Sequence, residues 1–303
     1  MSDQTIPMPA RRAPESPLRR VIAEFFESRT AAVGLVVFAL VAFVALFAPW
    51  ISPQNPYDLS QLDIMDGTLP PGSESFTIGT YWLGTDVQGR DMLSAIMYGL
   101  RMSLLVAGSA TLLALAIGIA AGTAAAYFGG WVDTLIMRIV DMQLSFPAIL
   151  IALILLAILG KGVDKVIIAL VIVQWAYYAR TVRGNALVER QRDYISAAQC
   201  LSLGHGRVMF RHLLPNCMPP LIVVATVQIA QAIALEATLS FLGVGVPVTE
   251  PSLGLLIANG YSYLLSGRYW ISFFPGIALL ITIVAINLVG DQLRDVLNPR
   301  LRK

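Results

Sequence analysis

Six stretches of the chain run for about twenty residues almost without charge, and they limit the folds that it can adopt. They cover residues 30–50, 102–132, 142–160, 166–179, 213–243 and 269–290. A helix needs roughly 20 apolar residues to cross the hydrocarbon core of a bilayer. The run at 166–179 is shorter. It reaches that length only if the side chains of Arg180 and Arg183, which follow it, extend to the membrane surface. We therefore predict an all-α polytopic membrane protein with six transmembrane helices.

The composition excludes a soluble enzyme. Hydrophobic residues make up 56% of the 303 residues and charged residues only 13%, against about 25% charged residues in a typical soluble domain. A soluble chain of this kind would have too few charges for its surface. The net charge of +2 is too weak a basic bias to indicate nucleic-acid binding.

The distribution of Lys and Arg sets the expected orientation. With the N-terminus inside, sixteen of the 21 Lys and Arg residues fall in cytoplasmic segments, as the positive-inside rule requires. Both termini are then cytoplasmic. We expect an N-terminal segment at 1–29, a transmembrane domain at 30–293 with an outside loop at 51–98 and a cytoplasmic loop at 180–215, and a tail at 294–303.

The segment before the first span has the pattern of an amphipathic helix. Ser16 and Pro17 form an N-cap followed by proline at the first helical position. Apolar side chains then recur at helical spacing, at Leu18, Val21, Ile22, Phe25 and Phe26. We expect this helix to lie in the cytoplasmic membrane interface. The alternative is a plain extension of the first span.

The chain lacks the motifs of a pump or an enzyme. Its Gly160-Lys161 pair is followed by Gly162 and has Leu155 where a phosphate-binding loop needs its first glycine. No Gly-x-Ser-x-Gly or His-Glu-x-x-His motif occurs. Metal-ligand spacing is absent from the cysteines and histidines, which are Cys200, Cys217, His205 and His212. We expect no catalytic residue, metal site or cofactor, so that any driving energy comes from a gradient or from another chain.

Glu236 is the clearest ionisable residue inside a predicted span. A carboxyl group at membrane depth is costly and is usually a functional candidate. Gln228 and Gln231 precede it on the same predicted helix, within a broad polar half. One interpretation is a helix face that lines a hydrated translocation path. The other is a polar contact with a neighbouring helix, or a carboxyl held protonated, and both interpretations stay open.

The cytoplasmic loop at 180–215 contains a short helical pattern. Asp193 is a good N-cap, residues 194–203 suit a helix, and Gly204 and Gly206 follow as stop signals. The apolar positions at helical spacing are Tyr194, Ala197, Ala198 and Leu201. Because so short a helix is not stable alone, we expect this small-residue face to dock into a groove of a partner. Packing on its own protein is the alternative.

Several motifs resemble one family of membrane proteins. Ser196-Ala197-Ala198 and the run 207–216 resemble the EAA loop of ABC importer permeases, which docks on a cytosolic ATPase. Matches to the C-type permease of dipeptide, oligopeptide and nickel importers follow in chain order, at Leu83-Gly84-Thr85-Asp86, Gly89-Arg90-Asp91, Phe128-Gly129-Gly130, Ser145-Phe146-Pro147, Ser240-Phe241-Leu242-Gly243, Gly290-Asp291 and Leu293-Arg294-Asp295. The resemblance covers about residues 20–303. Two positions depart from it, since Ser196 replaces the EAA glutamate and Ser202 the usual glycine of the loop.

This resemblance implies a type I, MetI-like permease in the bacterial cytoplasmic membrane, forming half of a translocation pathway. Its partners would be a homologous second permease, two cytosolic ATPases that bind ATP and magnesium, and an extracytoplasmic solute-binding protein. The residues implied in ATPase coupling are Tyr194, Ala197, Ala198, Leu201, Gly204, Arg207, Arg211 and Pro215. Those of the outside-loop motif are Gly84, Asp86, Gly89, Arg90 and Asp91. Short peptides are the expected solute, with nickel or other metal chelates, glutathione and opines as alternatives.

Two rival classes fit the residues less well. A gradient-driven carrier that works alone would need an intramembrane ion site or inverted repeats, and Glu236 alone favours it. A membrane-embedded enzyme would need a nucleophile with its base, or a metal constellation, and the sequence shows neither.

Overall fold

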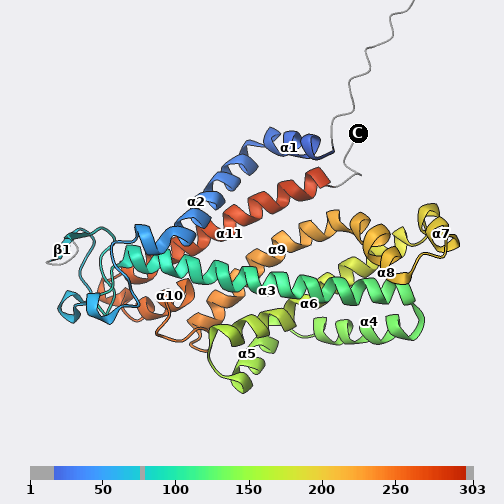
Figure 1. The fold of residues 1–303 in the computed structure, drawn as a ribbon. Helices are drawn as coiled ribbons and strands as arrows, with labels where there is room; N and C mark the ends of the chain where they lie inside the picture. Colours follow the sequence, from blue (N-terminus) through green and yellow to red (C-terminus); the bar gives the residue numbers. More distant parts are fainter. Residues whose placement is uncertain (1–16, 76–78, 298–303) are drawn as a thin grey trace, which may run out of the picture.

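The protein folds into an elongated bundle of helices (Figure 1). The computed structural model describes residues 17–75 and 79–297. Its helices are α1 (Pro17–Glu27), α2 (Arg29–Ile51), α3 (Met92–Phe128), α4 (Gly130–Leu144), α5 (Ala148–Leu159), α6 (Val163–Glu189), α7 (Asp193–Cys200), α8 (His205–Arg207), the π-helix η3 (Val208–Leu213), α9 (Leu214–Phe241), α10 (Leu253–Tyr261) and α11 (Trp270–Leu297). Short 3₁₀ turns are η1 (Leu59–Gln61), η2 (Ile64–Asp66) and η4 (Leu264–Ser266). Two short strands, β1 (Ser73–Ser75) and β2 (Gly79–Tyr81), pair antiparallel.

Five of the described helices are long and apolar enough to cross a membrane, namely α2, α3, α6, α11 and the run from α8 through α9. A sixth crossing results if α4 and α5, bent by 92° relative to each other, count as one span. The predicted bounds of the third span, 142–160, are therefore wrong. α5 has only 12 residues, and the helix breaks before it at Pro147, which has no N–H to donate.

The fourth span is longer than predicted. α6 continues without a break to Glu189, so Arg180 and Arg183 lie on the helix. Arg180 Nη2 lies 2.5 Å from Asp141 Oδ1, and Arg183 Nε lies 2.5 Å from Asp133 Oδ1. Both carboxylates belong to α4. Because these ion pairs neutralise the two arginines, the helix carries them without leaving a bare charge at the edge of the membrane.

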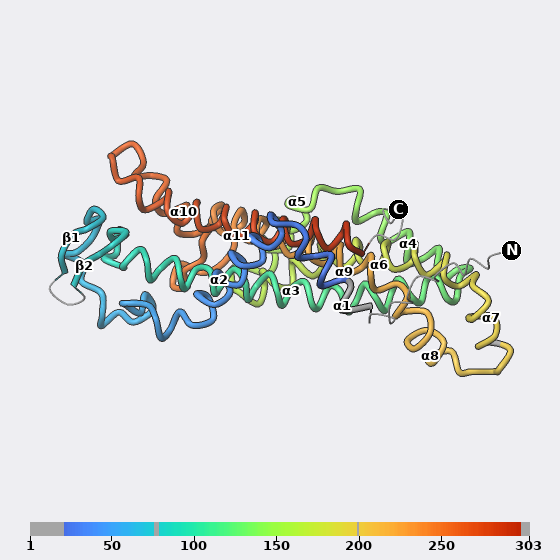
Figure 2. Tube along the Cα trace, turned by 90° about the horizontal axis from the view of Figure 1, so that it is seen from above, coloured from blue at the N-terminus to red at the C-terminus, as the bar shows by residue number. Residues whose placement is uncertain are grey.

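Two groups of connecting segments lie at opposite ends of the bundle. β1, β2 and α10 lie at one end and α7 and α8 at the other, in both views (Figure 1, Figure 2). The start of α2 packs beside the end of α11, through Ala31 and Val296. The loop predicted at 51–98 is shorter than expected, since α3 already begins at Met92. α10 lies in the second connection at that end, and the charge pattern of the sequence does not predict it.

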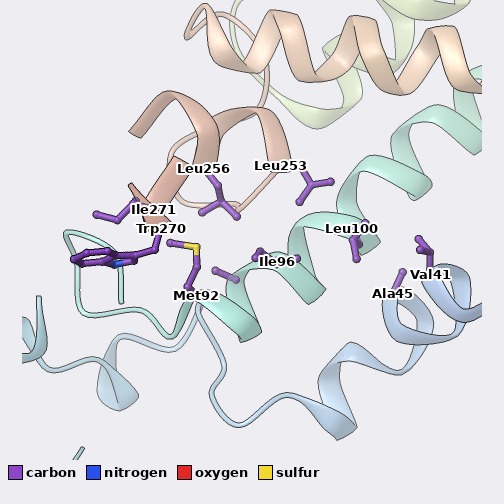
Figure 3. Packing of buried hydrophobic residues seen from close by; sticks show 10 residues of the cluster. Val41, Ala45, Met92, Ile96, Leu100, Leu253, Leu256, Trp270 and Ile271 are labelled. Carbon is purple, nitrogen blue, oxygen red and sulfur yellow. The ribbon is translucent and has the colours of Figure 1, made fainter. Parts of the chain in front are cut away.

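The end that carries β1 and β2 has a core of its own, in which α2, α3, α10 and α11 meet (Figure 3). Met92, Leu253, Leu256 and Ile271 are almost completely buried there. The indole Nε1 of Trp270 donates a hydrogen bond of 3.1 Å to the carbonyl of Thr85. This contact joins the start of α11 to the loop that precedes α3.

Glycines bring α3 and α6 into close contact. A Cβ atom on Gly118 would lie 2.4 Å from Tyr178 Cβ, and one on Gly122 would lie 2.4 Å from the carbonyl oxygen of Ala179. Small residues allow helix backbones to approach closely where lipid supplies no hydrophobic driving force. Large apolar side chains such as Val36 of α2 are instead exposed on the outside of the bundle, where lipid would cover them.

Candidate functional site

A groove with both polar and apolar side chains in its walls runs along α6 and α9. Its first part is a hollow of about 710 Å³ between α4, α6, α9 and α11, a size that suits a small-molecule ligand. Its polar lining consists of Tyr177, Arg180, Thr181, Gln228, Asp291 and Arg294. Its apolar lining includes Leu144, Pro219, Pro220, Val223 and Val227. This hollow lies toward the end of the bundle that carries α7.

A second hollow of about 430 Å³ continues the groove toward α5. Tyr177 and Gln228 line both hollows, so the two form one groove along α6 and α9. Gln174, Gln231 and Thr238 line the second hollow. α3 contributes no side chain to either described hollow, and the groove is therefore a feature of one side of the bundle.

Hydrogen bonds connect α3, α6 and α9 beneath this groove. Gln174 Nε2 donates to the carbonyl of Gln228 over 2.9 Å, and the hydroxyl of Thr111 on α3 donates to Gln174 Oε1 over 3.4 Å. α3, α6 and α9 are thus joined at the level where the two hollows meet. Gln231 is exposed on the wall above this contact.

Glu236 does not line either hollow. Its side chain is fully buried, and its two oxygens accept hydrogen bonds of 2.8 Å each from Ser103 of α3 and from Ser240. Ser240 Oγ in turn accepts the N–H of Val246 over 3.3 Å. Of the three candidates for a translocation path, Gln228 and Gln231 border the groove, and Glu236 makes the polar contact with a neighbouring helix that was the second interpretation.

The sequence assigns no path role to four residues that line the groove, which are Tyr177, Arg180, Asp291 and Arg294. The sequence does mark three of these residues: Arg180 ends the fourth apolar run, and Asp291 and Arg294 belong to the tail motif. The convergence of α6 and α11 on one hollow is a tertiary feature that the one-dimensional pattern does not contain.

α7 has one side that packs on its own chain. Ile195 and Ala198 are buried in a cluster with Ala126 of α3, Ala186 of α6 and Val208 of η3. The sequence places Ala198 on a face that docks on a partner. In the structure, the side of α7 that contains Ile195 faces the protein, and Ala198 lies on that buried side. The remaining members of the predicted face, which are Tyr194, Ala197 and Leu201, are exposed.

Hydrogen bonds fasten this loop to the ends of the long helices. The Tyr194 hydroxyl donates to Glu189 Oε2 over 2.9 Å and accepts from Asn216 Nδ2 over 3.0 Å. Partial burial and the Glu189 carboxylate raise the pKa of Tyr194 to about 12. The Tyr127 hydroxyl of α3 lies 2.8 Å from His205 Nδ1. The other coupling candidates, which are Gly204, Arg207, Arg211 and Pro215, are exposed nearby.

α7 ends differently from the prediction. Ser202 has φ +54°, a left-handed conformation that a residue with a Cβ adopts at a cost. The N–H of Leu203 bonds to the carbonyl of Ala198 over 3.3 Å, which is the long bond of a Schellman motif. Ser202 therefore occupies the terminating position that usually holds glycine. Gly204, expected to stop the helix, has φ −57° and caps the start of α8.

The outside-loop motif is a buried turn that leads into α3. Arg90 Nε and Asp86 Oδ2 form an ion pair at 2.8 Å, with both side chains about 3% exposed. Asp91 caps α3 by accepting the N–H of Ser94 over 2.9 Å. A Cβ on Gly89, which has φ +74°, would lie 2.0 Å from the carbonyl oxygen of Asp63. Gly84 also has a positive φ, +78°. These contacts give the motif a structural role.

The N-terminal helix α1 is divided between two environments. Phe25 is buried with Ala31 of α2 and Val296 of α11, whereas Ile22 and Phe26 are more than half exposed. The exposed pair is available for the membrane interface expected from the sequence. The predicted cap at Ser16 and residues 298–303 of the predicted tail lie outside the described residues, and the first part of that tail is helical up to Leu297.

A bundle with this bent pair, a one-sided polar groove and a helical loop between its fourth and fifth spans is the architecture of a type I ABC importer permease. The methionine ABC transporter MetNI in its inward-facing conformation shares this fold, with a TM-score of 0.55 at 21% identity, over 68% of this chain and 98% of that chain. An amino acid ABC transporter solved with histidines matches with a TM-score of 0.51 at 14% identity, over 67% and 94% of the two chains.

The chain belongs to the family of binding-protein-dependent transport system inner membrane components, which residues 114–303 match. Residues 16–71 match the N-terminal transmembrane domain of oligopeptide transport permease C. The dipeptide transport system permease protein DppC of Escherichia coli (strain K12) is 41% identical over 96% of this chain and 95% of its own length. The di/tripeptide transport system permease protein DppC of Pseudomonas aeruginosa (strain UCBPP-PA14) is 38% identical over 95% and 93%.

Family membership decides between the classes that the sequence left open. The chain is a multi-pass permease subunit of an ABC importer in the bacterial inner membrane. It is not an enzyme, since ATP hydrolysis belongs to partner ATPases, and a binding protein delivers the solute. The rival hypothesis of a carrier that works alone is therefore set aside.

Proposed function

We propose that this chain is a C-type permease subunit for short peptides and that the groove along α6 and α9 is its half of the translocation pathway. The groove is the observation that carries the proposal. Polar side chains such as Gln228 and Gln231 line it, on a bundle whose outward faces are otherwise largely apolar. Relatives that match nearly the whole chain and are named dipeptide permeases support peptides as the solute.

A homologous second permease would close this groove. The groove is open on one side, and a solute path through a bilayer needs protein walls all round because lipid cannot satisfy polar groups. A facing groove on the partner would supply those walls. Hollows of about 710 and 430 Å³ give room for a short peptide in extended form.

The exposed side of α7 is the proposed contact with an ATPase. Ala197 and Leu201 protrude there, and Arg207, Phe210 and Arg211 are exposed on the segment that follows. The opposite side of α7 packs against α3, α6 and η3. A displacement of α7 by the ATPase would therefore move the helices that form the groove, as rigid-body switching requires.

Transport by the reconstituted complex tests this function. The chain, its second permease and the ATPases are placed in proteoliposomes with the binding protein, and ATP-dependent uptake of a radiolabelled dipeptide is measured. We expect uptake that requires ATP and all subunits. The proposal is overturned if the complex carries only metal chelates, glutathione or opines, because each of these would assign the chain to another solute class.

A further inference from the structure

Charges of both signs converge on the 710 Å³ hollow from two helices. Arg180 of α6 and Asp291 and Arg294 of α11 all line it. Arg180 is already paired with Asp141 at 2.5 Å. Asp291 and Arg294 form no ion pair with any described residue. Among the described residues, the tail motif thus brings an unpaired carboxylate and an unpaired guanidinium to a hollow that also contains the paired guanidinium of Arg180.

Close packing fixes Asp291 at this place. The preceding residue, Gly290, also lines the hollow, and a Cβ on it would lie 2.8 Å from Thr226 Oγ1 of α9. α11 therefore approaches α9 one residue before the carboxylate, which leaves Asp291 at the rim. Asp295, one turn further along α11, does not line the hollow. Of the three charged residues near the end of α11, only Asp291 and Arg294 line the hollow.

We propose that this hollow holds the charged termini of a peptide on its way to the cytoplasm, with the α-carboxylate near Arg294 and the α-ammonium near Asp291. The proposal rests on the peptide function proposed above. Ion pairs between guanidinium and carboxylate are strong and directional. A simple anion or a simple cation would match only one sign of the lining. The apolar part of the wall, including Val223 and Val227, would accept varied side chains between the termini.

A cysteine inside the hollow can report on occupancy. Val227 lines the hollow and is 41% exposed, so Val227→Cys places a reactive thiol there. Cys200 is exposed and is replaced by Ser, while Cys217 is buried and can remain. The full complex of permeases and ATPases is prepared in nanodiscs without the binding protein. The rate of thiol labelling is measured with L-alanyl-L-alanine and with its N-acetylated, C-amidated analogue, which has no charged terminus.

We expect the dipeptide to slow labelling by about threefold at twice its Kd, because a third of the sites then remain free. The uncharged analogue should have no effect. Asp291→Asn combined with Arg294→Gln should abolish protection, and Asp295→Asn on the same helix should retain it. Equal protection by the analogue, or protection that survives in the double variant, would overturn the proposal.

Other occupants give different results. If zwitterionic lipid headgroups fill the hollow, labelling changes between phosphatidylethanolamine and phosphatidylglycerol nanodiscs and ignores the dipeptide, and the proposal fails. If the charges instead pair with the second permease, the double variant loses that subunit on purification, and the proposal fails likewise.

Uptake of the same dipeptide separates this inference from the proposed function. Normal uptake without protection removes only the inference, whereas wild-type complex that carries no peptide removes the function itself.

Discussion

Glu236 lies in the interior of the bundle with both carboxyl oxygens hydrogen-bonded, to Ser103 and to Ser240. A buried carboxyl group without such partners would be strongly unfavourable in this environment. The two serines and the N–H of Val246 form a small network that joins α3, α9 and the turn after α9. The position at membrane depth is visible in the sequence, but the identity of the partners is not, because Ser103 lies 133 residues away.

We predict that Glu236→Ala lowers the stability of the permease by about 1–3 kcal/mol, since two buried hydroxyls lose their acceptor. Glu236→Gln keeps an acceptor and a similar volume and should lose less. Thermal unfolding in mild detergent measures both. A Glu236→Ala protein as stable as wild type that fails to transport would instead indicate a direct role in the solute path.

Ser202 is the second residue whose conformation carries a prediction. Its φ of +54° strains a residue that has a Cβ, and glycine relieves the strain at no steric cost. Removing the cost of a left-handed residue, about 1–2 kcal/mol, is partly offset by the greater freedom of glycine in the unfolded chain, about 0.4–1 kcal/mol. Ser202→Gly should therefore stabilise the loop by about 0.5–1 kcal/mol, seen as slower limited proteolysis between α7 and α8. Gly204→Ala is the matched control, because Gly204 has φ −57° and open space around its Cβ. Slower proteolysis in the control and not in Ser202→Gly would contradict the assignment.

Among the elements, α7 shows most clearly where periodicity is informative and where it is not. The spacing of Tyr194, Ala197, Ala198 and Leu201 indicates a helix, and α7 is one. Spacing alone does not say which of two adjacent faces turns inward. Ile195, which lies outside the predicted face, is fully buried. Because α7 packs through Ile195, Ala198 also faces the protein. The π-helix η3 that supplies part of the pocket for Ile195 has no sequence signature.

Two adjacent alanines should therefore respond differently. Ala197→Asp changes an exposed position, so the permease should fold and assemble with its second permease but lose the ATPase on copurification. Ala198→Asp buries an unpaired charge against Ile195 and Val208, so it should destabilise the loop itself. Detergent size-exclusion profiles and subunit stoichiometry distinguish the two results. Retention of the ATPase by a well-folded Ala197→Asp protein would remove α7 as the docking element.

Cysteine labelling gives an independent check at the same element. Cys200 is exposed at the end of α7, and Cys217 is buried in α9. A thiol reagent should label Cys200 in the permease pair and label it several-fold more slowly once the ATPases bind. Cys217 should react slowly in both preparations. An unchanged rate at Cys200 would mean that the ATPase does not cover this surface.

α4 shows the limit of reading spans from charge. The predicted third span starts at Met142 because Asp133, Arg138 and Asp141 interrupt the apolar pattern before it. The ion pairs of Asp133 and Asp141 with α6 allow α4 to pack beside the other long helices all the same. A pairing across about 40 to 50 residues cannot be inferred from hydropathy, and the bent pair is therefore a finding of the structure.

For the whole molecule, the class of fold follows from the sequence because bilayer thickness sets the length of an apolar run. The outside-loop motif is identified from the sequence only through the family resemblance, and its Asp86–Arg90 ion pair is a finding of the structure. The groove is not predicted, because it forms where α6, α9 and α11 meet. Of its polar wall, only Gln228 and Gln231 were candidates before the fold was known.

The central claim is that this groove conducts the solute, and blocking it from inside tests that claim most directly. Gln231→Cys, in a Cys200→Ser background, places a thiol on the exposed wall of the second hollow. Val36→Cys on the exposed face of α2 is the control. After treatment with a bulky thiol reagent, ATP-dependent dipeptide uptake is measured in proteoliposomes. The account predicts that modified Gln231→Cys loses uptake while the complex stays assembled, and that modified Val36→Cys keeps it. Full uptake through modified Gln231→Cys would contradict the account.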